Sequence, residues 1–246
     1  MHTRSVRPEI LDDLSPDDPR AIQSRRDLRT INTLMGHPAF IARSLRAAPM
    51  PRVVVELGAG DGAVLLSVAK RLGRPPTRVR AILIDRRPSL TDGTTAAFER
   101  EGWDVESCAS DVFDWLSHPT TDDADVMLAN LFLHHFPDAD LAALLSSASR
   151  RTAHFIACEP LRSRTALAGV ALMPLIGCSA VTRHDGAVSV RAGFRGRELS
   201  ALWPNDGGWQ IAERRLGLFS QTFVAHRVAG LKPCVTVAPA RLSPAP

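Results

Sequence analysis

A short apolar run that leads into three closely spaced glycines constrains the fold of this chain more than any other feature. Residues 52–57 read RVVVEL, and Gly58, Gly60 and Gly62 follow directly, before a helical pattern of apolar residues begins at Ala63. Glycines at such a turn let the backbone bend sharply and let a ligand approach where any Cβ would collide. The stretch therefore predicts a strand, a ligand-binding turn and a helix, in that order.

Strand-like and helix-like segments alternate after this turn. We predict further strands at 79–84, 103–107, 124–131 and 153–158, with helices at 63–72, 90–101, 112–116 and 139–150. Such alternation is typical of right-handed βαβ units in an α/β, doubly wound parallel sheet. The runs 209–216 and 219–227 are separated by only a tight turn, which permits an antiparallel hairpin but no parallel crossover. We therefore expect a mixed sheet that closes with a hairpin.

The segments before the first strand are predicted to be mainly helical. Residues 1–20 are polar and rich in Pro and Asp, so we expect them to be loose. Apolar residues recur at helical spacing over 21–48, and the sequence GHP at 36–38 divides this stretch into two helices. We assign residues 1–50 to an N-terminal helical segment that acts as a lid or cap, and residues 51–228 to the main domain.

An uncharged stretch lies within an insertion that we place at about residues 160–200. Residues 166–180 carry no charged side chain, but they are shorter than the roughly 20 residues of a spanning helix, and Pro174 interrupts them. We interpret the stretch as a buried or substrate-covering helix without stable membrane insertion, and peripheral contact with a membrane stays an open alternative. Residues 229–246 are rich in Pro and Ala and are predicted to be a flexible tail.

The charge pattern argues against a nucleic-acid partner. The chain has 30 Lys and Arg against 26 Asp and Glu, and the two signs are interspersed without a run of five like charges. The 4 cysteines form no C-x-x-C pair, which argues against zinc, and no apolar signal segment follows the N-terminus. We expect a cytoplasmic protein that binds no nucleic acid, and its oligomeric state is left open.

An acidic residue at the end of the second predicted strand indicates an adenosine ligand. Asp85 lies 23 residues after Gly62, where a carboxylate can accept hydrogen bonds from both ribose hydroxyls. A nicotinamide dinucleotide is the main rival, because the turn also fits the dinucleotide fingerprint. Glu56 opposes that rival, since a carboxylate beside the turn repels a pyrophosphate but favours the cationic ammonium and sulfonium groups of S-adenosylmethionine.

Motifs at the ends of four predicted strands resemble those of the class I methyltransferases, which use S-adenosylmethionine. The matching residues are E-x-G-x-G-x-G at 56–62, Asp85, S-D-V at 110–112 and N-L-F-L-H-H at 130–135. The resemblance covers about residues 21–227. It implies a seven-stranded Rossmann-like sheet of order 3-2-1-4-5-7-6 with strand 7 antiparallel, in agreement with the predicted hairpin.

The resemblance also implies which residues bind the donor. Glu56, Gly58 and Gly60 would line its methionyl part, and Ala59 and Gly62 of the same turn would also bind the donor. Asp85 would hold the ribose, and Arg86 would flank the adenine. Asp111 and Val112 would contact the adenine, and Asn130 would present its backbone near the methyl group.

A narrower resemblance concerns the methyl acceptor. The sequences RDLRTIN at 26–32, CEPLR at 158–162 and TRHDG at 182–186 resemble bacterial small-molecule methyltransferases associated with type III polyketide synthases and quinone pathways. This resemblance implies O-methylation of a small hydrophobic or aromatic compound, phenolic, polyketide or quinone-like. C-methylation of an activated ring, an NAD(P)-dependent oxidoreductase and a non-catalytic adenosine-binding protein remain as alternatives.

Three histidines are candidates for a catalytic general base. A phenol with a pKa near 10 benefits from losing its proton before methylation, and histidine titrates near neutrality. His134 and His135 follow the fourth predicted strand, and His184 lies in the insertion. Asp185 adjoins His184, but adjacent side chains usually point apart, so the pair is not predicted to form a dyad.

A metal site is not predicted near these histidines. His134, His135, Asp138 and Asp140 are all potential ligands. However, Asp138 as the N-cap of the helix that begins near Ala139 is a simpler account of the acidic spacing. We therefore expect no metal.

Overall fold

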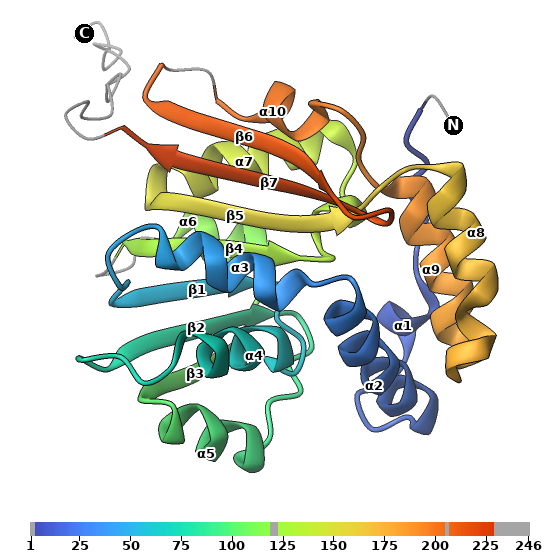
Figure 1. Cartoon of the computed structure of the whole chain (residues 1–246), viewed down its shortest axis with the longest axis horizontal. Coiled ribbons are helices and arrows are strands. Elements are labelled where there is room, and N and C mark those ends of the chain that lie inside the picture. Colours follow the sequence, from blue (N-terminus) through green and yellow to red (C-terminus); the bar gives the residue numbers. More distant parts are fainter. Residues whose placement is uncertain (1–2, 119–122, 205–206, 229–246) are drawn as a thin grey trace, which may run out of the picture.

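Seven strands form one sheet in the order β3-β2-β1-β4-β5-β7-β6 (Figure 1). The computed structural model describes residues 3–118, 123–204 and 207–228. Strands β1 to β5 are parallel to one another, whereas β7 is antiparallel to both β5 and β6. Their bounds are Val53–Leu57 (β1), Val79–Asp85 (β2), Trp103–Ala109 (β3), Ala124–Asn130 (β4), Thr152–Pro160 (β5), Trp209–Leu216 (β6) and Ser220–Arg227 (β7). The predicted strand order and closing hairpin are confirmed.

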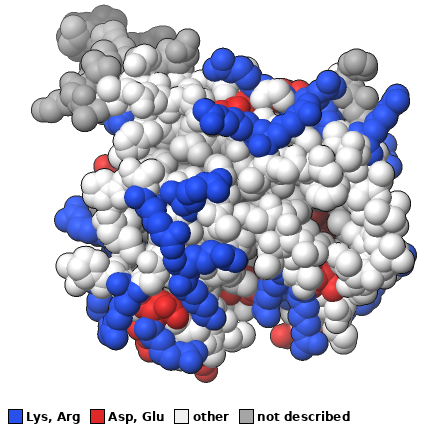
Figure 2. Space-filling model, in the orientation of Figure 1, with Lys and Arg blue, Asp and Glu red and all other residues white. Residues whose placement is uncertain are grey.

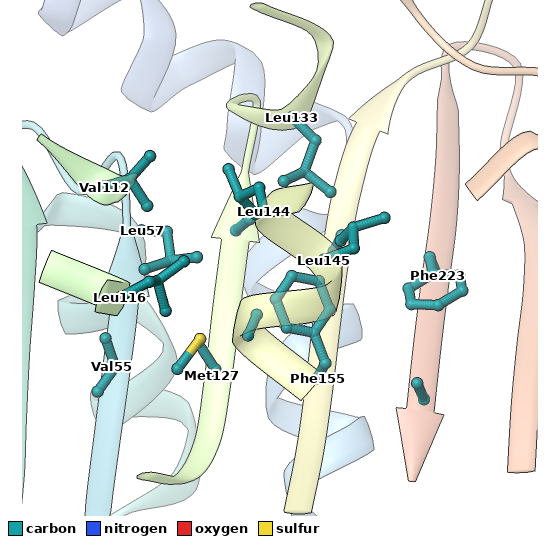
Figure 3. Close-up of a cluster of buried hydrophobic side chains, with 14 of the residues drawn as sticks. Val55, Leu57, Val112, Leu116, Met127, Leu133, Leu144, Leu145, Phe155 and Phe223 are labelled. Atoms are coloured by element: carbon teal, nitrogen blue, oxygen red, sulfur yellow. The ribbon is translucent and has the colours of Figure 1, made fainter. Parts of the chain in front are cut away.

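Helices cover both faces of the sheet, which explains why the central strands are apolar on both sides. One face packs against α3 (His37–Arg46), α4 (Ala63–Leu72) and α5 (Asp92–Arg100). The other face packs against α6 (Val112–Ser117), α7 (Asp138–Arg151) and α10 (Glu198–Leu202). Figure 3 shows the second layer, in which Leu144 and Leu145 of α7 face Met127, Phe155 and Phe223 of the sheet.

A group of helices outside this sandwich gathers beyond the carboxyl ends of the parallel strands. It combines α1 (Ile10–Asp13) and α2 (Pro19–Leu34) with α8 (Arg164–Leu172), the 3₁₀ turn η2 (Met173–Ile176) and α9 (Ala180–Ala192). α9 contacts α1, α2 and α8, so segments far apart in sequence lie side by side on the right of Figure 1. Ligands of open α/β sheets bind at this edge, so these helices are positioned to cover a site.

The prediction that residues 1–20 are loose is wrong for the part that the structure describes. Arg4 forms an ion pair with Asp138, and its guanidinium lies 4.3 Å from the centre of the Phe194 ring. The backbone amide groups of Ile10 and Leu11 donate to the carboxylate of Asp185 at 2.9 and 3.0 Å. These long-range contacts, invisible to local composition, hold the segment against α9 and η1 (Leu133–His135).

Two local expectations are also corrected. Asp138 does not cap α7, because the helix begins at Asp138 itself, Pro137 occupies the N-cap position, and the carboxylate pairs with Arg4. The uncharged stretch 166–180 is not one buried helix: α8 ends at Leu172, and Pro174 lies in η2, where Leu175 is 81% exposed. That this stretch covers a substrate stays a prediction. None of the helices in the described residues is long and apolar enough to span a membrane. The predicted tail at 229–246 lies outside those residues.

Candidate functional site

The turn between β1 and α4 is built as the glycine spacing predicts. Gly58, Gly60 and Gly62 have φ angles of 69°, 57° and 71°, a region that residues with a Cβ rarely adopt. A Cβ on Gly58 would lie 2.1 Å from the ring of Phe132, and one on Gly62 would lie 2.7 Å from Leu83. Nothing lies within 4 Å of a Cβ placed on Gly60, so the space above the middle of the turn is available to a ligand.

Glu56 places a carboxylate beneath this turn, at the end of β1. It is only 2% exposed, it accepts a hydrogen bond from the backbone of Leu65, and its Oε2 has no hydrogen-bond partner. Burial, reinforced by the nearby negative charges of Asp61 and Asp85, raises the pKa of Glu56 to about 8. A buried carboxylate with an unpartnered oxygen is stabilised by a cation, so this position suits a positively charged ligand group.

Asp85 connects the end of β2 to the glycine turn. Its Oδ2 accepts from the backbone amide of Gly60 at 2.8 Å, and its Oδ1 accepts from that of Arg87 at 2.8 Å. Each carboxylate oxygen has capacity for a further bond, so Asp85 can also accept hydrogen bonds from ribose hydroxyls. Ala59 lies beside it, with its amide bonded to the carbonyl of Ile84.

The predicted adenine side of the site follows β3. Asp111 caps α6 by accepting from the amide of Phe113 at 2.8 Å. Its Oδ2 lies 3.9 Å from the Nε of Arg86, whose side chain is 81% exposed. Val112 is buried in the core beneath them. The structure thus brings all ten predicted donor-binding residues to the carboxyl ends of four adjacent strands, which makes one continuous site geometrically possible.

Asn130 lies at the end of β4 in a buried polar network that the sequence analysis missed. The Nδ1 of His37 lies 2.7 Å from Oδ1 of Asn130 and 3.0 Å from Oδ1 of Asn32, and its Nε2 lies 2.8 Å from the hydroxyl of Ser220. Burial lowers the pKa of His37 to about 4, so its ring is neutral, with Nδ1–H donating to the two amide oxygens. The network fixes α2 and α3 against the end of β4 and the start of β7.

An ion pair ties the N-terminal helices to the glycine turn. Arg29 of α2 donates from Nε and from a terminal nitrogen to Oδ2 of Asp61 at 2.9 and 2.6 Å, while Oδ1 of Asp61 accepts from the amide of Ala63. The side chain of Arg29 is 54% exposed, so the pair contributes little to folding stability. The ion pair instead holds α2 over the turn that would carry the donor.

An apolar cavity of about 170 Å³ lies between α2, α8, η2 and α9. Its walls include Leu28, Ile31, Leu131, Val170, Met173 and Phe219. Leu131, with a φ of 51°, directly follows Asn130, and such backbone strain is concentrated at functional sites. The cavity therefore reaches the point where the predicted donor would present its methyl group.

His134 is buried between two carboxylates. Its Nδ1 donates to Glu159 at 2.7 Å and its Nε2 to Glu9 at 3.3 Å. Burial opposes protonation, but these hydrogen bonds outweigh it and raise the pKa of His134 to about 9. The ring is therefore an imidazolium at neutral pH. Glu159 is fully buried and also accepts from the backbone amides of Phe132 and Leu133, which fixes the chain that follows Leu131.

His135 and His184 each lie beside an aspartate. His135 pairs with Asp12 at 3.3 Å, and His184 is 54% exposed and bonded to Asp185 at 3.0 Å, although we expected these neighbours to point apart. None of the three histidines is among the residues that line the cavity. The ligand atoms of Glu9, His134 and His135 lie within 4.8 Å of one another, an arrangement of donors that could hold a metal ion. Both ring nitrogens of His134 are, however, already hydrogen-bonded to carboxylates.

The buried imidazolium predicts an alkaline loss of stability. Because the folded-state pKa of His134 is raised, its ion pairs stabilise the fold below the ordinary value of 6.5 and are lost as the pH rises through about 9. We expect the free energy of unfolding, measured by urea titration, to fall between about pH 7 and pH 10. The fall should be smaller in His134→Gln; equal slopes in the two proteins would contradict the assignment of this charge.

Comparisons with known proteins find a methyltransferase domain in the part of the chain that carries the glycine turn. Residues 54–154 match the model of a family described as a methyltransferase domain, and this match contains the glycine turn, Asp85, Asp111 and Asn130. No curated protein matches the chain.

Several solved structures share the fold at low sequence identity. The plantazolicin methyltransferase BpumL in complex with SAH is 12% identical at a TM-score of 0.60, over 86% of this chain and 92% of that one. An O-methyltransferase described as putative, from Nostoc punctiforme, is 16% identical at a TM-score of 0.56, over 87% of this chain but 62% of that one. An O-methyltransferase family protein from Burkholderia thailandensis is 16% identical at a TM-score of 0.53, over 88% and 64%.

Proposed function

We propose that this chain, whose residues 54–154 match a methyltransferase domain, is a class I methyltransferase that uses S-adenosylmethionine. We propose further that it methylates a hydroxyl group of a small, largely apolar phenolic, polyketide or quinone-like acceptor. The observation that carries this proposal is the apolar cavity that reaches Leu131, next to the end of β4. Two of the structural neighbours, from Nostoc and Burkholderia, bear O-methyltransferase names, which supports the same class of reaction.

The residues of the turn fit the donor that this activity needs. The donor supplies a methyl group on positively charged sulfur, so the electrophile is already activated. The unpartnered oxygen of Glu56 suits the cationic methionyl part, the open space at Gly60 admits a ligand backbone, and Asp85 retains capacity for the ribose. The remaining task of the protein is to align the acceptor and exclude water. We propose residues 1–50, with the insertion at about 160–200, as the lid that does this.

The size of the cavity limits the acceptor. A cavity of roughly 150 Å³ lined by apolar side chains holds one benzene ring, and this cavity has about 170 Å³. A single aromatic ring therefore fits inside it, whereas a longer substituent has to leave through the opening.

An exposed apolar rim lies along α2, the end of α8 and η2. It consists of Leu34, Leu172, Leu175 and Ile176, with exposed fractions of 51–81%. The surface over α8 and α9 is largely uncharged on the right of Figure 2.

The rim predicts a preference for acceptors with an alkyl chain. We expect Ile176→Asp to raise KM roughly tenfold for a phenol bearing a pentyl or longer chain, because each buried methylene contributes about 0.8 kcal/mol. KM for the unsubstituted phenol should change little. Ile22→Asp is the matched control, since Ile22 is an exposed residue of α2 outside the cavity lining. Equal effects of the Ile176 substitution on both phenols would contradict an alkyl-binding rim.

The proposed function is tested by incubating the purified protein with labelled S-adenosylmethionine and a panel of phenols, hydroxyquinones and aromatic polyketides. Mass spectrometry should find a labelled methyl ether, and NMR of that product separates O-methylation from C-methylation of the ring. A protein that binds the donor but labels no member of the panel would contradict the proposed acceptor class. The assignment of His135 or His184 as general base stays a prediction. His134, the third candidate, is protonated at neutral pH and has both ring nitrogens bonded to carboxylates, which opposes that role.

A further inference from the structure

One carboxylate in the wall of the acceptor cavity is only partly occupied by hydrogen bonds. Glu9 lines the cavity and is only 9% exposed, so its carboxylate is largely shielded from solvent. Its Oε1 accepts from His134 at 3.3 Å and from the hydroxyl of Ser189, whereas no residue that the structure describes donates to Oε2. An acceptor hydroxyl that enters the cavity can therefore donate to Oε2.

The second carboxylate of the cavity wall has no oxygen without a hydrogen bond. Asp185 also lines the cavity, but its Oδ1 accepts from the amide of Ile10 and lies 3.0 Å from Nδ1 of His184, and its Oδ2 accepts from the amide of Leu11. The hydroxyl of Ser189 is already donated to Glu9. Among the described lining residues, Glu9 is therefore the charged group with an oxygen that accepts no hydrogen bond.

Glu9 is also connected to the place where the methyl group is expected. His134 bridges Glu9 to Glu159, and Glu159 holds the amides of Phe132 and Leu133, which follow Leu131 in the cavity wall. The chain of contacts fixes the position of the Glu9 carboxylate relative to the end of β4. Such fixed positioning is what a catalytic group needs.

We propose that Glu9 is a catalytic residue that binds the acceptor hydroxyl and accepts its proton, an inference that rests on the proposed O-methylation. In the step, an oxygen electron pair forms the bond to the methyl carbon, and the carbon–sulfur bond breaks with its pair remaining on sulfur. The acceptor O–H bond breaks, and the proton passes to Oε2 of Glu9 and later to water. The hydroxyl becomes strongly acidic as its oxygen bonds to carbon, so a carboxylate is basic enough to take the proton late in the transfer.

The neighbouring imidazolium of His134 explains why the Glu9 carboxylate stays ionised and can accept a proton. Burial alone would favour the protonated acid, but the hydrogen bonds and charges of the histidines, with the bond from Ser189, lower the pKa of Glu9 below its ordinary value. His134 thus acts as a positioning residue, which keeps Glu9 ionised and oriented. At neutral pH His134 is itself protonated and has no free nitrogen for the acceptor.

The test uses two acceptors of similar shape and different acidity. One is an alkylphenol with a pKa of about 10, and the other is an electron-poor phenol that is already ionised at about pH 7.5. We expect Glu9→Gln to lower kcat for the protonated phenol by about 10²-fold and to leave the ionised phenol within about threefold of wild type. The Kd of S-adenosylhomocysteine should not change. Asp13→Asn is the control, because Asp13 is an exposed acid at the end of the same helix, α1.

Each outcome of this test decides the proposal. Equal losses of kcat with both phenols in Glu9→Gln would show a structural role and overturn the proposal. It would also be overturned if His135→Ala, and not Glu9→Gln, lowered kcat for the protonated phenol alone. If Glu9→Gln does not fold, Glu9→Asp keeps the charge beside His134 but retracts the carboxylate, and it should show the same selective loss at a smaller size. Wild-type protein that methylates neither phenol, yet binds S-adenosylhomocysteine, would instead overturn the proposed function and this inference together.

Discussion

Replacing Asp85 by alanine is expected to weaken binding of S-adenosylmethionine and S-adenosylhomocysteine by about 10²-fold, and by at least tenfold. The carboxylate holds the amides of Gly60 and Arg87 at 2.8 Å, so its loss both loosens the turn and removes the proposed ribose contact. Hydrogen bonds to a charged group contribute roughly 1.5–3 kcal/mol each, and losing one such bond costs about tenfold or more in affinity. Calorimetric titration of the two ligands measures the effect.

Asp104→Ala is the matched control for this substitution. Asp104 lies at the beginning of β3, with a side chain that is 56% exposed and paired with Arg78, at the opposite edge of the sheet. It should leave both affinities unchanged. An Asp85→Ala protein that stays folded and binds either ligand within threefold of wild type would show that the ribose does not lie on Asp85.

Replacing Glu56 by glutamine is expected to move donor binding and folding stability in opposite directions. The neutral amide cannot balance the ammonium and sulfonium charges, so the Kd of S-adenosylmethionine should rise about tenfold or more at pH 8. The same change removes the cost of burying an ionised carboxylate. The Tm of the unliganded variant should therefore be several degrees higher than that of wild type at pH 8.

The pH dependence of the two proteins follows from the raised pKa of Glu56. In the unliganded fold its pKa is about 8 against an ordinary value of 4.5, so its burial costs stability progressively as the pH rises from 4.5 to about 8. A cationic donor favours the ionised form, so wild-type affinity should rise by up to tenfold per pH unit until about pH 8 and then level off. In Glu56→Gln this slope should be absent.

Titrations of both proteins between about pH 6 and pH 9 distinguish this account from a general effect of the substitution. Isothermal calorimetry in two buffers of different ionisation enthalpy should detect proton release on donor binding to wild type below pH 8. A Glu56→Gln protein that binds S-adenosylmethionine as tightly as wild type, with the same pH slope, would show that the buried carboxylate does not face the cationic part of the donor.

The parts of the fold that repeat locally could be predicted from the sequence. A buried parallel strand, a glycine turn and a following helix each have a short-range signature, so the strands and the closing hairpin were predictable. The order of the strands in the sheet was implied only by the resemblance to class I methyltransferases. The end of β2 at Asp85 was predictable for the same reason, because a charged side chain at the end of an apolar run marks the carboxyl edge. Glu159 at the end of β5 carries the same signal, and the prediction overlooked it.

The parts that depend on long-range contacts could not be predicted in this way. Glu9 stands in a polar segment with no periodicity, and only the fold brings it to His134 and the cavity. His37 reads locally as part of a helix break, although it is fully buried between Asn130 and Ser220. Asp138 reads as a helix cap until Arg4, 134 positions away, is brought beside it. Ion pairs and polar networks between distant segments leave no local pattern.

A crystal structure with bound S-adenosylmethionine tests the central claim most directly. The account predicts the methionyl ammonium beside the unpartnered oxygen of Glu56, the ribose on Asp85, and the methyl group directed past Leu131 into the apolar cavity. A turn that stays empty at saturating donor, or that accepts the diphosphate of a nicotinamide dinucleotide across Gly58 and Gly60, would contradict it.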